Sequence, residues 1–169
     1  RWRQGGRLSN PHRSNQVDPR HAISELVARS CMTLDDKDFA AYLELCDPEY
    51  RYTITAYSPE IRKDMTWLDH DKEGMKTLFT NLPRHNSDQS PITRHVTLYT
   101  VEHDEAAQQA KVVSALQVFR TQLDGGATEL FAVGKLHDTI NLAGDKPRLL
   151  ERNVRLDTRM LGYGYHIPF

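Results

Sequence analysis

The order of its periodic segments constrains this chain most: apolar side chains recur first at helical spacing and, after Pro91, at the two-residue spacing of β-strands. Helices are expected over residues 18–32 and 35–46, and from about residue 69 or 71 to a stop at Pro83. Strands are expected over residues 49–57, 92–102, 111–121, 128–140 and 150–160, with an irregular, charged connection at 58–66. Helices followed by a long antiparallel run predict an α+β fold, in which a strongly curved sheet wraps the helices as a cone-like roll.

Charge balance and apolar run length exclude two classes of function. The formal net charge is −1, which argues against a dedicated nucleic-acid binder. The apolar runs fall short of the roughly 20 residues of a membrane span, and we expect neither a span nor a signal peptide. Cys31 and Cys46 lie in helix-like patterns without a neighbouring ligand cluster. Buried free thiols and a cytoplasmic location are therefore expected, with a disulfide or a reactive thiol as the alternatives.

Composition divides the chain into an arm and one domain. Residues 1–16 carry four arginines with glycine, asparagine and serine, and they cannot form a core of their own. This basic segment is either a floppy terminus or an arm laid across a partner, with Trp2 as its anchor. Residues 17–169 are long enough for a single α+β roll domain with a sizeable core.

The closing strand, residues 150–160, alternates between an apolar and a polar face. The expected inward residues are Leu150, Val154, Leu156 and Met160. The expected outward residues are Glu151, Asn153, Arg155, Asp157 and Arg159, which suit a contact surface as well as solvent. The segment after Gly162 ends on Ile-Pro-Phe, and an apolar end of this kind is expected to be covered by its own subunit or by a neighbour, with a neighbouring subunit preferred.

Motifs for chemistry are sparse. A glycine-rich phosphate loop, a nucleophile elbow and a His-Glu-x-x-His pair are all missing from the sequence, and its eight histidines are scattered. His70 between Asp69 and Asp71 is a candidate metal cluster, although a solvated helix cap explains it more simply. Polar strand residues could line a pocket inside the roll, or be satisfied sheet or interface residues: Tyr50, Tyr52, His95, Tyr99, His137 and Asp138.

Four segments taken together carry a resemblance to a known family. They are residues 34–39 leading into the Tyr50–Tyr52 strand, 91–96 (PITRHV), 129–138 (ELFAVGKLHD) and 152–157 (RNVRLD). In this order the chain resembles the small (beta) subunit of ring-hydroxylating-type Rieske non-haem iron oxygenases, over residues 18–169. Residues 56–71 are more similar to the methanesulfonate monooxygenase branch of that family, and Gly134-Lys135-Leu136 departs from its usual Gly-Arg-Arg.

The resemblance implies a nuclear-transport-factor-like (cystatin-like) roll and a structural role without catalysis. It implies a trimer of small subunits within an α3β3 hexamer, whose large subunits hold a Rieske [2Fe–2S] cluster and a mononuclear iron supplied with electrons by a ferredoxin or reductase. Paired Cys and His motifs for such a cluster, and a two-His-one-carboxylate set for iron, are missing here, so we expect neither metal, cofactor nor catalytic residues in this chain. The candidate subunit-contact residues are Trp2, Arg94, His95, Arg155, Asp157, Arg159, Tyr163, Tyr165 and Phe169. The competing hypothesis is a free-standing dehydratase or isomerase that uses Tyr50, His95 or Asp138.

Overall fold

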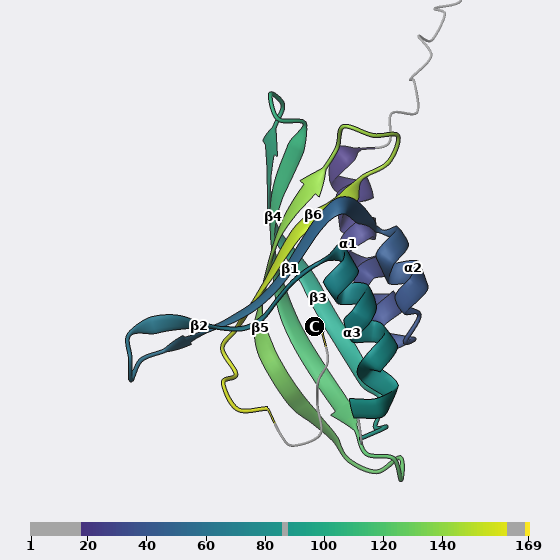
Figure 1. The fold of residues 1–169 in the computed structure, drawn as a ribbon, viewed down its shortest axis with the longest axis vertical. Helices are drawn as coiled ribbons and strands as arrows, with labels where there is room; N and C mark the ends of the chain where they lie inside the picture. The colour runs from purple at the N-terminus through teal and green to yellow at the C-terminus, as the bar shows by residue number, and fades with distance from the viewer. Residues whose placement is uncertain (1–17, 86–87, 162–167) are drawn as a thin grey trace, which may run out of the picture.

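The computed structural model describes residues 18–85, 88–161 and 168–169. Its helices are α1 (Pro19–Asp35), α2 (Phe39–Glu44) and α3 (Lys72–His85). Its strands are β1 (Cys46–Ser58), β2 (Lys63–Asp71), β3 (Ile92–Asp104), β4 (Gln109–Thr121), β5 (Thr128–Asn141) and β6 (Arg148–Leu156). The six strands form one sheet in the order β2-β1-β6-β5-β4-β3, which curves around the helices (Figure 1). The expected α+β roll is confirmed.

Neighbouring strands of the sheet are antiparallel except at its centre. There β1 and β6 run parallel, with Ile54 opposite Val154. A parallel pair needs a long crossover connection, and here the crossover contains α3 and the four strands β2 to β5. The pairing brings the first strand beside the last and closes the roll around its core.

Short polar caps define the helices. The Asp18 side chain accepts a hydrogen bond from the Arg20 backbone N–H at 3.0 Å, and Pro19 occupies the first helical position. Asp71 accepts from the Gly74 N–H at 2.8 Å and so starts α3. The helix does not end at Pro83 as expected but runs to His85. A proline in the last turn removes only one backbone donor, and the turn continues past it.

Residues 63–71 form strand β2, so the expected irregular connection at 58–66 was wrong over residues 63–66. Of the two helix starts expected, residue 71 is confirmed as the cap of α3 and residue 69 was wrong. The strand pairs with β1 in an antiparallel hairpin that reaches beyond the body of the roll (Figure 1). Thr66 lies opposite Thr55, and a bulge between Ile54 and Thr55 shifts the register. Backbone pairing with β1, rather than the local charged composition, decides the conformation of this segment.

Strand β6 is shorter and differently registered than its alternation predicts. A bulge between Thr139 and Ile140 places Leu149 at 0% exposure, while Leu150 is only partly buried. The strand ends at Leu156, and Met160 is 90% exposed rather than inward-facing. The bulge moves the inward position from Leu150 to Leu149, which the side-chain pattern alone does not reveal, whereas Val154 and Leu156 face the core as predicted.

One hydrophobic core fills the space between the inner face of the sheet and the helices. Phe39 of α2 stacks on Phe79 of α3 with ring centroids 4.4 Å apart. Cys31 and Cys46 lie inside this core as free thiols, which confirms the expectation of buried cysteines. Burial raises the pKa of both thiols, that of Cys46 to about 12.

Candidate functional site

A buried ion pair occupies the centre of the roll. Arg152 donates from Nε and Nη2 to the two carboxylate oxygens of Asp138, each at 2.8 Å, and both side chains are 0% exposed. Its Nη1 donates to Ser30 Oγ at 2.9 Å. Burial disfavours the Arg152 cation, but the Asp138 carboxylate outweighs this effect and the pKa of the guanidinium is raised. The polar atoms of Arg152 and the Asp138 carboxylate are therefore hydrogen-bonded within the chain and are not available to a substrate.

Sequence reasoning found Asp138 but missed Arg152 and Ser30. Arg152 stands at an inward position of the closing strand, and that position was a signal that could have found it. A charged residue among Leu149, Val154 and Leu156 on the core side requires a buried partner, and Asp138 lies directly opposite it on β5. Ser30 recurs at helical spacing with Ile23 and Val27 on the buried stripe of α1, and a serine in that stripe was a weaker signal of the same kind.

Two tyrosines beside this pair are also satisfied internally. The Tyr42 and Tyr50 hydroxyl oxygens are 2.6 Å apart and share a hydrogen bond. Burial raises the pKa of both phenols well above the ordinary value. Tyr50 is therefore held neutral within the core, where it is 1% exposed and its hydroxyl is occupied by Tyr42.

The histidines proposed for acid–base chemistry lie on the opposite face of the sheet. His95 is exposed and its ring contacts Phe119 of β4, with centroids 4.9 Å apart. His137 is also exposed, one residue from the inward Asp138. The structure thus separates His95 from Tyr50 and Asp138 by the thickness of the sheet. The Tyr/His/Asp pocket of the dehydratase hypothesis is not formed.

The last two residues of the sequence dock into the roll. The Phe169 N–H donates to Tyr52 Oη at 2.7 Å, and Tyr52 Oη donates to the Phe169 carbonyl oxygen at 3.0 Å. Arg94 Nη2 donates to the Pro168 carbonyl oxygen at 2.8 Å. Phe169 is 1% exposed, so its cover is the interior of its own chain and not the neighbouring subunit that the sequence favoured. Tyr163, Tyr165 and Trp2 lie outside the described residues.

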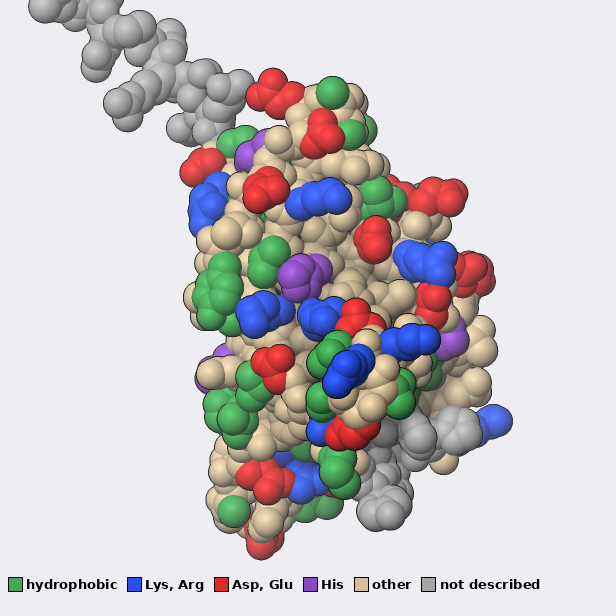
Figure 2. All heavy atoms as spheres, turned by 90° about the vertical axis from the view of Figure 1, so that its left-hand side faces the viewer, with side chains coloured by type: hydrophobic (Ala, Val, Ile, Leu, Met, Phe, Trp, Pro, Cys, Tyr) green, Lys and Arg blue, Asp and Glu red, His purple; other side chains and the backbone are tan. Residues whose placement is uncertain are grey.

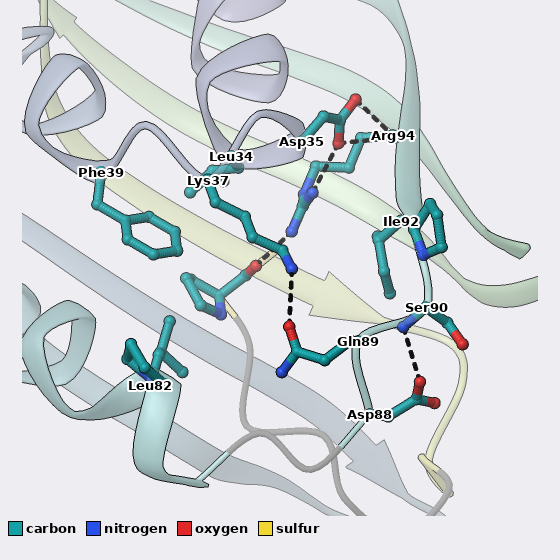
Figure 3. A pocket seen from close by; sticks show the side chains of 13 residues that line it. Leu34, Asp35, Lys37, Phe39, Leu82, Asp88, Gln89, Ser90, Ile92 and Arg94 are labelled. Atoms are coloured by element: carbon teal, nitrogen blue, oxygen red, sulfur yellow. Dashed lines mark hydrogen bonds and ion pairs between the residues drawn. The ribbon is translucent and has the colours of Figure 1, made fainter. Parts of the chain in front are cut away.

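A cavity of about 180 Å³ opens at the mouth of the roll, beside Pro168. Apolar side chains from all three helices and β3 form its walls, among them Leu34, Phe39, Leu82 and Ile92 (Figure 3). Arg94 lies in the same wall, where its Nη1 donates to Asp35 Oδ1 at 2.7 Å. Its Nε is a buried donor that has no acceptor among the described residues. The lining of this cavity combines an apolar wall with the charged side chains of Asp35, Lys37 and Arg94.

The face of the sheet that points away from the helices, called the outer face below, carries a mixed surface. No described helix packs on it, and Figure 2 shows charges of both signs, histidines and hydrophobic side chains interspersed there. Tyr57, Tyr99 and Leu130 are its large exposed apolar residues, at 47%, 55% and 53% exposure. This surface combines the apolar and charged groups found in subunit interfaces.

The contact candidates of the closing segment already have partners in the chain. Arg155 donates to both Asp64 oxygens, at 3.1 and 2.9 Å, which raises the pKa of the guanidinium. Arg159 donates to Glu60 Oε2 at 2.6 Å and lowers the pKa of this carboxyl to about 2. These exposed pairs tie the β1–β2 hairpin to the closing segment. Asp157 is exposed and follows β6 directly.

Metal ligands do not converge in the described part of the chain. Residues 18–85, 88–161 and 168–169 hold no group of three His, Cys, Asp or Glu side chains that could bind a metal ion. The carboxylates on either side of His70 already have partners within the chain: Asp69 forms an ion pair with Arg51 at 2.6 Å, and Asp71 caps α3. These residues therefore do not fit an iron or iron–sulfur centre. Within the same ranges, none of the helices is long and apolar enough to cross a membrane.

Comparison with known proteins adds a family match. The family model for "Ring hydroxylating beta subunit" matches residues 29–162. The methanesulfonate monooxygenase hydroxylase subunit beta of Methylosulfonomonas methylovora is 38% identical, covering 95% of this chain and 96% of the relative. The 2-aminobenzenesulfonate 2,3-dioxygenase subunit beta of an Alcaligenes species is 29% identical, over 87% of this chain and 97% of that one. The structure of naphthalene 1,2-dioxygenase with bound indole has a TM-score of 0.70 at 17% identity, covering 89% of this chain and 84% of that chain.

Proposed function

The chain belongs to the family of ring-hydroxylating beta subunits, and we propose on that premise that it is the structural, non-catalytic small subunit of an oxygenase. The iron chemistry then belongs to a large subunit, which holds a Rieske [2Fe–2S] cluster and a mononuclear iron and receives electrons from a ferredoxin or reductase. The closed interior supports this division, since Arg152 pairs with Asp138 and Tyr50 shares a hydrogen bond with Tyr42, so that none of them offers an acid or base to a ligand.

The outer face carries this proposal. A soluble monomer rarely leaves a broad sheet face with several large apolar side chains uncovered, and a partner subunit would cover it. We propose that three copies assemble through it into a trimer that supports three large subunits in an α3β3 hexamer. In cyclic symmetry, one patch of each copy meets a different patch of the next, and obligate interfaces of this kind commonly bury more than about 2,000 Å².

Four predicted contact residues fit this assembly: His95, Arg155, Asp157 and Arg159 are exposed or partly exposed on the outer face or just after β6. Arg94 and Phe169 are buried in their own chain, so any contribution to assembly would be indirect, through the shape of the roll mouth. Trp2, Tyr163 and Tyr165 stay predictions. None of these roles involves a reacting atom.

We further propose that the complex oxidises an organic sulfonate, with methanesulfonate as the first candidate, and that it works in the cytoplasm. The two curated relatives are named for methanesulfonate and for 2-aminobenzenesulfonate, and both compounds are sulfonates. The substrate would bind in the large subunit. The small subunit would affect turnover only through assembly.

Co-expression with the large-subunit gene tests the proposal. Copurification of a larger protein with the electron paramagnetic resonance spectrum of a Rieske cluster, and oxygen-dependent methanesulfonate consumption by the complex, are expected. A chain that purifies without a partner and turns over a small substrate unaided would overturn it. His95→Ala should leave the rate per iron nearly unchanged in the assembled complex, whereas a loss of many orders of magnitude would assign His95 to chemistry.

A further inference from the structure

The cavity at the mouth of the roll has the size of one small ring. Its volume is about 180 Å³. Dry apolar cavities of about 150 Å³ in proteins bind benzene. Leu34, Phe39 and Leu82 form an apolar wall of this cavity, and Ile92 faces them from β3 (Figure 3). The cavity therefore has room for the apolar part of a ligand about the size of one six-membered ring.

Both carboxylates in the lining of this cavity are engaged in ion pairs, whereas its lysine is not. Asp35 is paired with Arg94 at 2.7 Å, and Asp88 with Arg120 at 3.2 Å. Lys37 forms no ion pair among the described residues; its Nζ donates to the neutral Gln89 Oε1 at 3.3 Å, across the cavity (Figure 3). Lys37 is thus a lining cation without a carboxylate partner among the described residues, and it stands beside an apolar wall, where a ligand anion would pair with it.

The backbone of Lys37 gives an independent reason to look for a function. Its φ is 56°, in the left-handed region, where it follows the end of α1. Its N–H donates to the Leu34 carbonyl oxygen at 3.1 Å, and the Asp38 N–H donates to that of Thr33 at 2.8 Å. Glycine is the usual residue at such a helix end. A lysine there keeps an unfavourable backbone conformation and places an ammonium group at the cavity, a combination typical of functional positions.

We propose that this cavity binds a small organic anion, with a ring-sized apolar body against Leu34, Phe39 and Leu82 and a carboxylate or sulfonate group at Lys37. The Nε of Arg94 in the same wall, which has no acceptor among the described residues, adds a buried donor to this site. The proposal does not depend on the oxygenase role, because it concerns a separate site that the chain carries by itself.

Ligand-observed NMR titration of the full chain tests the proposal with benzoate, benzenesulfonate, benzyl alcohol and acetate as probes. Saturable binding is expected for the two ring acids. Benzyl alcohol lacks the charge and acetate lacks the ring, so each should bind at least about tenfold more weakly. Equal affinity for benzoate and benzyl alcohol, or for benzoate and acetate, would overturn the proposal.

Two substitutions of Lys37 separate charge from backbone. Lys37→Gln and Lys37→Gly should each weaken benzoate binding about tenfold or more. Lys37→Gly should not lower the thermal unfolding midpoint, because glycine tolerates φ of 56°. The matched control Lys76→Gln removes an exposed charge from α3 and should leave binding unchanged. Benzoate affinity in Lys37→Gln equal to that of the wild type, or no saturable benzoate binding to the wild type, would refute the site.

Discussion

Arg152 and Asp138 face each other across strands β6 and β5, joined by two hydrogen bonds of 2.8 Å with no exposed surface on either side chain. The pair lies where a cone-shaped roll would otherwise hold a polar pocket. Because each charged oxygen and nitrogen has a partner within the chain, the pair fixes the core in one arrangement. An enzyme that used this interior would need one of these groups free.

Asp138→Asn should destabilise the fold strongly. The change leaves the Arg152 guanidinium buried without a counter-charge, and breaking such a pair on one side typically costs about 3–5 kcal/mol. Urea unfolding followed by circular dichroism would measure the loss. The control is Asp69→Asn, which breaks the exposed pair with Arg51 and should cost far less, because solvent screens that pair. Equal losses for the two variants would contradict the buried-pair interpretation.

Periodicity predicted most of the fold because most elements bury one face. The stripe of Ile23, Leu26 and Val27 marks α1, and strict alternation marks β4. Strand β2 was missed because its residues are mostly exposed or partly exposed, so its sequence carries almost no alternation. The parallel pairing of β1 with β6 joins segments about a hundred residues apart, and no local pattern encodes it.

The site was harder to predict than the fold. His95 and Asp138 both stand on strands, but their side of the sheet depends on register, and only the assembled sheet shows that they face opposite ways. Lys37 at the mouth cavity gave no signal either, since its left-handed backbone depends on how α1 ends. The family resemblance, which rests on several segments in order, predicted the role better than any single residue did.

Phe169→Ala should also destabilise the chain. The ring is 1% exposed and lies against Phe131, with centroids 6.4 Å apart, so truncation leaves a cavity under the sheet. Losses of about 3–5 kcal/mol are typical for such changes. Differential scanning calorimetry would report a lower unfolding midpoint. Leu123→Ala, at a residue 69% exposed, is the control and should shift it little. A fully stable Phe169→Ala protein would mean that the end of the chain only rests on the sheet.

The cysteines should resist thiol reagents in the folded protein. Burial raises the pKa of Cys46 from 9.0 to about 12, so near pH 8 its thiolate is about a thousandfold scarcer than that of an ordinary cysteine. Ellman's reagent should therefore react slowly with native protein and rapidly after unfolding. Stability should also fall as pH rises above 9, because the unfolded thiols ionise there while the folded ones do not. Rapid native modification of Cys46 would show that the core opens readily.

The outer face offers a direct test of assembly at Ala115, in the middle of β4 between Thr97 of β3 and Lys135 of β5. Ala115→Arg adds a long cation to that face, where it can reach solvent in the isolated chain. Its effect on monomer stability should thus stay within about 0.5 kcal/mol. In an assembly that buries the face, the same cation is desolvated opposite a partner, and sedimentation velocity should show loss of the trimer.

Thr80→Arg is the matched control, since it places the same side chain on an exposed position of α3, away from the sheet. It should leave the sedimentation coefficient and copurification with the large subunit unchanged. If Ala115→Arg assembles as well as Thr80→Arg does, the outer face is not the contact between copies. The helical side of the roll or the β1–β2 hairpin would then have to supply it. If the Ala115→Arg variant dissociates and the Thr80→Arg variant does not, the exposed Tyr99 and Leu130 are buried by a neighbouring copy in the assembly.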